Sequence, residues 1–109
     1  MIVTLTTGQK IEVDIKHQTM NRLNRKNPDL VEEHRYTQAQ LFWFDDYTSR
    51  RMPGVIATGV AHLHPNDRFV KSHGVKVALQ KALEQIDFSK EDRRRIWRKM
   101  WNGKYDKAN

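Results

Sequence analysis

The sequence predicts an α+β fold in which about four antiparallel strands, arranged as two hairpins, are followed by two C-terminal helices packed on one face of the sheet. Two observations support this prediction. The first part of the chain contains β-branched and aromatic runs separated by turn residues. Within residues 62–86 a strand end and a polar turn give way to the apolar period of a helix. We therefore expect one domain that is β-rich over 1–64 and helical over 65–103, with a tail at 104–109.

The first hairpin is predicted from two short strands. Residues 2–6 form a β-branched run, and Gly8 lies in the turn that follows it. Residues 10–16 alternate between apolar and charged side chains. This alternation is typical of a strand with one face buried and the other in solvent.

Residues 17–34 are polar and are interrupted by Pro28. We expect a long loop here, with one helical turn over 18–24, that widens the first hairpin. Loops of this length are often functional. The alternatives are a solvated excursion and a basic arm over a ligand, and the cations of such an arm are Arg22, Arg25 and Lys26.

The second hairpin is predicted from strands at 35–47 and 55–64. The first of these strands has apolar side chains on both faces near 42–44, so we expect that end to be covered on both sides. A partner chain is one candidate for the covering, which favours a homodimer or a higher homo-oligomer. Gly59 interrupts the second strand and indicates either a bulge or a close approach of another backbone.

The first helix is the most regular pattern in the chain. Apolar side chains follow a helical period over 75–86, and we expect this stripe to lie across the sheet. Its members are Val75, Ala78, Leu79, Ala82, Leu83 and Ile86. Asn66 or Asp67 is the predicted helix cap, and Ser72 is a second candidate if the helix starts later.

The second helix is predicted to begin at its cap, Ser89, and to stop at Asn102–Gly103. Its apolar side chains are Ile96, Trp97, Met100 and Trp101. Its basic side chains are Arg93, Arg94, Arg95, Arg98 and Lys99. Because consecutive residues point around most of a helix, we expect at least one of these cations near the sheet or a partner chain, with Asp45 and Asp46 as candidate partners.

Composition limits the classes of protein. The chain has 109 residues, a net charge of +7 and no cysteine, which excludes disulfide frameworks and thiol nucleophiles. We see neither a signal peptide nor an apolar run long enough to cross a membrane, so we expect a soluble, cytoplasmic protein. The positive charge favours anionic partners, although a charge of this size also serves solubility.

Known catalytic and metal-binding patterns are not found in the sequence. The phosphate-binding glycine motifs and the G-x-S-x-G elbow are absent. His62 and His64 share a strand face and His73 could approach them, but no further ligand completes a known spacing. The acids at 45–46 and Asp67 are typical turn residues. We expect no enzyme activity, no catalytic residues, no metal site and no cofactor.

The junction between the second hairpin and the first helix groups side chains that suit a nucleotide. Asn66 can donate to and accept from a base edge, Phe69 can stack on a base, and Arg68 can clamp a phosphate. The start of a helix adds free backbone N–H groups. The other cations of this candidate ligand site are Lys71, Lys76, Lys81, Arg94 and Arg95. The alternative is a capped helix with Phe69 in the core and its lysines in water.

Three functions are compatible with these features. The leading one is a non-enzymatic protein that binds and sequesters an anionic nucleotide signal, as a homodimer or higher homo-oligomer. A nucleic-acid-binding module is the first alternative, and its phosphate contacts would come from Arg22, Arg25, Arg93, Arg98 and Lys99. A protein-interaction inhibitor of a host enzyme is the second, using the aromatic strand at 42–47.

A resemblance favours the first of these functions. Residues 64–101, about a third of the chain, follow a pattern that reads here Pro65-Asn66-Asp67, Phe69, Lys71, Gly74, Lys76, Ala78-Leu79, Lys81-Ala82-Leu83 and Arg95-Ile96-Trp97. The pattern is similar to that of small phage proteins, and the size, element order and basic character resemble phage anti-Thoeris sponge proteins, which sequester a cyclic ADP-ribose-type signal. The resemblance implies a ligand site lined by Asn66, Phe69 and the cations of both helices, in the cytoplasm of an infected host. The pattern has arginine where this chain has Lys76 and Lys81, which lack the planar fork for two-point phosphate binding.

Overall fold

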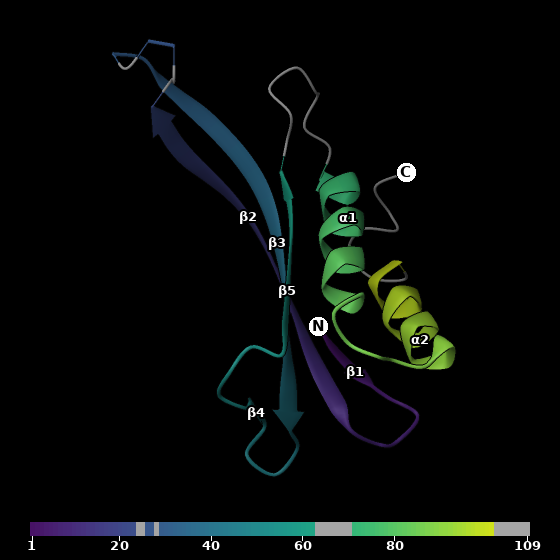
Figure 1. Cartoon of the computed structure of the whole chain (residues 1–109). Helices are drawn as coiled ribbons and strands as arrows, with labels where there is room; N and C mark the ends of the chain where they lie inside the picture. Colours follow the sequence, from purple (N-terminus) through teal and green to yellow (C-terminus); the bar gives the residue numbers. More distant parts are fainter. Residues whose placement is uncertain (24–25, 28, 63–70, 102–109) are drawn as a thin grey trace.

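The computed structural model describes residues 1–23, 26–27, 29–62 and 71–101. All strand pairs in this part of the chain are antiparallel and belong to one sheet, and both helices lie on the same side of it (Figure 1). The predicted α+β class, with two helices at the C-terminal end packed on the sheet, is therefore confirmed. The elements in order are β1 (Ile2–Thr4), β2 (Lys10–Leu23), β3 (Val31–Asp45), β4 (Arg50–Arg51), β5 (Ala57–His62), α1 (Lys71–Leu83) and α2 (Lys90–Trp101).

The long hairpin of β2 and β3 corrects one prediction. The two strands pair without a break from Lys10 and Phe44 to Leu23 and Val31. The loop with a helical turn predicted for 17–34 is therefore wrong, because most of that segment is strand. Apolar alternation does not reveal these strands because this half of the hairpin covers no core, and Met20, for example, is exposed.

β3 is the central strand of the sheet. Along its second edge it pairs with β4 at one end and with β5 further back, the last pair being Tyr36 with His62. Beyond that pair the β2–β3 hairpin is two-stranded and projects from the body of the protein (Figure 1). The radius of gyration is 16.2 Å, against about 13 Å for a compact chain of this length. We refer to this projection, residues 19–23 and 31–35, as the arm.

α1 lies across β5 and β3, as its apolar stripe predicted. Gly59 of β5 touches the helix backbone, because a Cβ added there would lie 1.9 Å from the carbonyl oxygen of Ala78. The close backbone approach predicted at Gly59 is thus confirmed. Ser72 lies inside α1 rather than before it, so it does not cap the helix; the other cap candidates, Asn66 and Asp67, lie outside the described residues.

The core is formed between the helices and one face of the sheet. Its buried side chains come from alternate positions of the strands and from the apolar faces of the helices. The largest core side chains that are fully buried are Ile11, Leu41, Val75, Leu79 and Ile96. Within the residues that the structure describes, neither helix has the length and apolar composition needed to span a membrane.

α2 begins at its predicted cap: the Ser89 Oγ accepts a hydrogen bond from the N–H of Asp92 at 3.1 Å. One cation of α2 lies at the sheet, as expected, because Arg95 donates to the carbonyl oxygen of Thr4 at 3.4 Å. Both suggested acidic partners, Asp45 and Asp46, are wrong, because Asp45 accepts hydrogen bonds from its own turn. Asp46 instead pairs with Lys10, at 2.7 Å from the Lys10 Nζ.

Candidate functional site

The solvent-facing side of α2 carries two arginines that lie one turn apart. Arg94 and Arg98 are both exposed, and a spacing of four places them on the same face of the helix. The opposite face of α2 buries Ile96 and Met100 in the core. The helix is therefore held by its apolar side and presents both guanidinium groups to solvent.

Two tryptophans lie beside these arginines. The rings of Trp97 and Trp101 are stacked, with centroids 6.0 Å apart and planes inclined by 15°. Both residues are half-buried and pack against the core, so part of each residue remains accessible. We call the surface formed by Arg94, Trp97, Arg98 and Trp101 the α2 ridge.

The remaining cations of α2 have other positions. Arg93 folds back on the helix start, where its Nε and Nη2 donate to the carbonyl oxygen of Phe88 at 3.2 and 3.1 Å. Arg95 pairs with Glu91 at 3.7 Å in addition to its contact with β1. Lys99 is exposed but follows Arg98 by about 100° around the helix, so it lies to one side of the α2 ridge. The tribasic run thus divides into structural and solvent-facing members.

The charges of the α2 ridge are uncompensated within the described residues. No carboxylate there lies within ion-pair distance of Arg94 or Arg98. Arg98 stands in the last helical turn, where the helix dipole is negative and stabilises a cation. The attraction of this surface for anions therefore comes from the side chains and not from backbone N–H groups.

The structure separates the two predicted site lysines of α1. Lys81 donates its Nζ to the carbonyl oxygen of Val60 on β5 at 3.1 Å. Lys76, five residues earlier, is exposed and lies about 140° away around the helix. The two ammonium groups therefore do not converge on one ligand within a single chain.

Several predicted site residues cannot be placed. Asn66, Arg68, Phe69 and Arg25 lie outside the described residues. Lys71 is the first residue of α1, and Arg22 belongs to β2 near the far end of the arm. The junction therefore stays a prediction from the sequence, whereas the α2 ridge is described by the structure.

The aromatic segment of β3 is mostly covered by the chain itself. The guanidinium of Arg51 lies 4.2 Å from the ring centroid of Phe42, and Trp43 packs against the core from the other face. Coverage on both faces is as expected, and at Phe42 it comes from β4 rather than from a partner chain. Tyr47 is 99% exposed and is the part of this segment still open to a protein partner.

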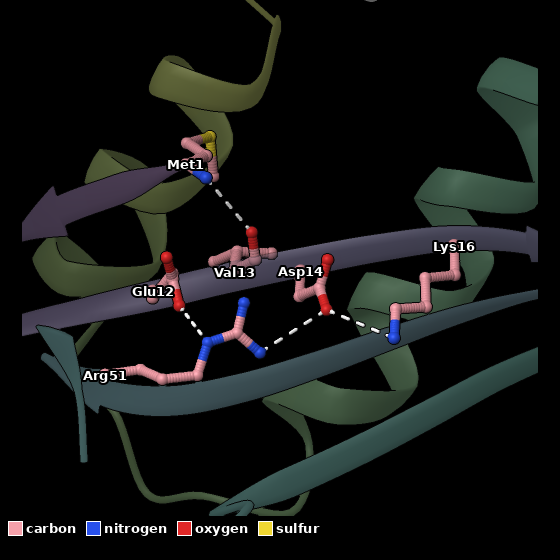
Figure 2. A network of polar contacts seen from close by, with 6 residues as sticks. All are labelled: Met1, Glu12, Val13, Asp14, Lys16 and Arg51. Carbon is pink, nitrogen blue, oxygen red and sulfur yellow. Dashed lines mark hydrogen bonds and ion pairs between the residues drawn. The ribbon is translucent and has the colours of Figure 1, made fainter.

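The polar side of the sheet near β4 is held by ion pairs (Figure 2). Arg51 lies between two carboxylates of β2, with its Nε 2.5 Å from Glu12 Oε2 and its Nη1 3.5 Å from Asp14 Oδ2. A hollow of about 640 Å³ adjoins it, with Asp45, Arg50 and Met52 among its lining residues. Since Arg51 is occupied and Asp45 accepts hydrogen bonds from its own turn, the hollow offers an anion little beyond Arg50.

A histidine cluster at the base of the arm was missed from the sequence. His34 Nε2 and His62 Nδ1 are 2.8 Å apart, and the ring of Tyr36 lies beside His62. The sequence predicts a loop at His34 and therefore gives no sign of its neighbour on β5; only the strand register shows the pair. In the part of the chain that is described, no group of three or more His, Cys, Asp or Glu side chains is placed to hold a metal.

Comparisons with models of protein families, with curated proteins and with solved structures find no match in any of the three. The function is therefore inferred from the side chains of this chain and from their arrangement.

Proposed function

We propose that this protein binds and sequesters an anionic nucleotide signal without transforming it, and that the α2 ridge contacts the ligand. The observation that carries the proposal is the pair of exposed arginines, Arg94 and Arg98, with no acidic partner among the described residues, beside the stacked Trp97 and Trp101. The resemblance of the chain's size, element order and basic character to those of anti-Thoeris sponge proteins supports the same function.

Each group of the ridge suits one part of a nucleotide. A guanidinium binds phosphate through two parallel hydrogen bonds, which a lysine cannot do. An indole face stacks on a base, a contact worth about 1–3 kcal/mol. Because Arg94 and Arg98 flank Trp97 in the sequence and share its side of α2, one ligand would contact a base platform and two phosphate-binding groups together.

Sequestration requires more enclosure than one convex helix provides. Ligand sites are usually concave and bury most of the ligand surface. We therefore include a homo-oligomer in the proposal, in which the α2 ridge of a second copy closes over the ligand. The proposed place of action is the cytoplasm, and that of the host if the protein is encoded by a phage.

Calorimetry with cyclic ADP-ribose isomers, linear ADP-ribose and cyclic dinucleotides tests the proposal. The wild-type chain should bind at least one of them, and Arg94→Gln with Arg98→Gln should weaken that affinity at least tenfold. The matched control is Lys16→Gln with Arg50→Gln, which removes the same charge from other exposed positions and should change affinity less than threefold.

Two results would overturn the proposal. One is a folded wild-type protein that binds none of these ligands. The other is recovery of a chemically altered nucleotide when the complex is denatured and its small molecules are analysed by mass spectrometry. Recovery of the unchanged ligand is the expected result.

A second candidate, a nucleic-acid-binding module, is favoured by the arm. A two-stranded β-ribbon fits the major groove of DNA, and the arm is such a ribbon projecting from the body (Figure 1). Gel shifts across a salt series measure the number of phosphate contacts, because affinity falls steeply with salt when several are made. Replacing 22–32 by Asn-Gly removes Arg22, Arg25 and Lys26. This candidate requires the shortened variant to lose affinity; equal affinity would exclude the arm as the contact.

A further inference from the structure

The histidine pair joins the arm to β5. His34 lies on β3 and His62 on β5, and both face the side of the sheet that carries no helix. Their ring centroids are 5.0 Å apart, with planes inclined by 34°. His62 stands opposite Tyr36 in the register, so His34 is its diagonal neighbour. The two imidazoles therefore approach each other from strands whose spacing the sheet fixes.

The nitrogen separation suits a shared cation. The Nε2 of His34 and the Nδ1 of His62 are 2.8 Å apart, close enough to share one proton. Bonds from imidazole to a divalent metal measure about 2.0–2.1 Å, so two adjacent ligands at a right angle lie about 2.9 Å apart. In a tetrahedral site they would lie about 3.3 Å apart. The observed separation matches neighbouring positions of a square-planar ion, the geometry preferred by Cu²⁺ and Ni²⁺.

The surroundings of the pair are those of a borderline or soft metal. Met20 of β2 is the cross-strand partner of His34 on β3, so the two side chains share one face of the sheet. Met20 is 38% exposed, and it places a thioether beside His34. The acidic side chains described on this face, Glu12 and Asp14, are held by Arg51 near the other end of the sheet. The donors described next to the pair are thus nitrogen and thioether, which favour copper over calcium, magnesium or manganese.

We propose that His34 and His62 chelate Cu²⁺ through Nε2 and Nδ1, respectively, with water or further donors at the remaining positions. Copper is preferred to nickel because it binds more tightly to the same ligands. The bound ion takes the place of the shared proton. If one imidazole of the pair is charged, binding releases one proton to solvent. If both imidazoles are neutral, binding releases no proton, because the shared proton moves to another ring nitrogen of the pair. The bound ion would join the base of the arm to β5, independently of the nucleotide proposed for the α2 ridge.

Titration of the full chain with Cu²⁺, in a buffer containing glycine as a competing chelator, tests this site. The wild-type protein should bind one ion per chain, and His34→Ala and His62→Ala should each lower the affinity at least tenfold. His73→Ala is the matched control, because His73 is an exposed histidine on α1, on the other side of the sheet, and its removal should change the affinity less than twofold.

Electron paramagnetic resonance of the wild-type complex gives a second readout that does not depend on any variant folding. Two imidazole nitrogens coupled to the copper are the expected result. Coupling to fewer than two nitrogens, or affinities of the two alanine variants equal to that of the wild type, would overturn the proposal. So would the absence of competitive Cu²⁺ binding by the folded wild-type chain.

Discussion

The side chain of Gln85 takes the place of a neighbouring strand at Thr58 of β5. Its Nε2 donates to the carbonyl oxygen of Thr58 at 2.5 Å, and its Oε1 accepts from the Thr58 N–H at 3.4 Å. One turn earlier, Lys81 satisfies the carbonyl oxygen of Val60. An edge strand with unpaired backbone groups is a template for pairing with another chain, and these two side chains close it.

We predict that Gln85→Ala weakens both folding and resistance to self-association. The free energy of unfolding should fall by about 1–2 kcal/mol because two backbone groups lose their partners. Light scattering during storage should show association that the wild type does not. Urea denaturation measures the free energy of unfolding. Gln80→Ala, in the last turn of α1 before Gln85, is the control, because it removes only an exposed bond to Glu84. Equal behaviour of both variants would contradict the assigned role of Gln85.

The opposite edge of the sheet is closed in the same manner by α2. Asp92, which is buried, accepts a hydrogen bond from the Thr6 N–H at 2.8 Å, and Arg95 donates to the carbonyl oxygen of Thr4. The backbone hydrogen bond from Thr6 is the main cause that holds the pKa of Asp92 below its ordinary value of 3.8. Burial opposes this shift, and the nearby Arg95 adds to it.

We predict that Asp92→Ala destabilises the protein at neutral pH and has a smaller effect in acid. A carboxylate whose pKa is lowered by folding contributes stability above its unfolded value of 3.8 and loses it as the pH falls through the folded value. The loss should be about 2 kcal/mol at pH 6, the range for hydrogen bonds to a charged group. Urea denaturation at pH 6 and near pH 3 measures both values. Glu91→Ala is the control, since it lies in the same first turn but is exposed. A loss for Asp92→Ala that is independent of pH would contradict the prediction.

These edge contacts mark the limit of what the sequence predicts. The helices of this fold could be predicted because each has a one-sided apolar stripe, and Ser89 could be predicted as a cap from its position before two acids. The partners of Gln85 and Asp92 could not, because they are backbone groups 27 and 86 residues away. Nothing in a side chain's own neighbourhood specifies which distant strand edge it will reach.

The arm and the candidate sites show a second limit. Apolar alternation reports burial, so a strand that buries neither face has no such signal, and His34 was read as part of a loop for this reason. The basic character of α2 was visible in the sequence, yet the run Arg93–Arg95 gave no indication which member faces solvent. That depends on the phase of the helix, which Ile96 and Met100 fix by packing into the core.

We predict that Gly59→Ala is strongly destabilising, because β5 and α1 touch through their backbones at this position. An added Cβ would lie 1.9 Å from the Ala78 oxygen and 2.5 Å from the Ala82 nitrogen, and neither backbone atom can rotate away. The cost should be about 3 kcal/mol or more, which lowers the melting temperature by about 12 °C or more. Gly8→Ala is the comparison. Its Cβ meets open space, and only its positive φ of 90° is unfavourable, for about 1–2 kcal/mol. Calorimetric melting of both variants should rank Gly59→Ala well below Gly8→Ala, and the reverse order would contradict the close approach.

We predict that Arg51 stabilises the sheet through its two carboxylate partners more than through its cover of Phe42. Arg51→Met keeps apolar cover over the ring but leaves Glu12, whose side chain is 21% exposed, without its cation (Figure 2). The free energy of unfolding should fall by about 1–3 kcal/mol, because a partly buried carboxylate is left unpaired. The neighbouring Arg50→Met is the matched control, since Arg50 is exposed and has no acidic partner among the described residues, and it should change stability by less than about 0.5 kcal/mol.

A double-mutant cycle separates the two roles of Arg51. If the unpaired charge causes the loss, Glu12→Gln combined with Arg51→Met should recover most of it, because the neutral amide no longer needs a cation. If lost packing on Phe42 causes it, the double variant should be no more stable than Arg51→Met alone. Urea denaturation of the four proteins at one pH decides between these outcomes. The first is expected because the Arg51 Nε contacts Glu12 at 2.5 Å, while the Arg51 side chain as a whole remains 42% exposed.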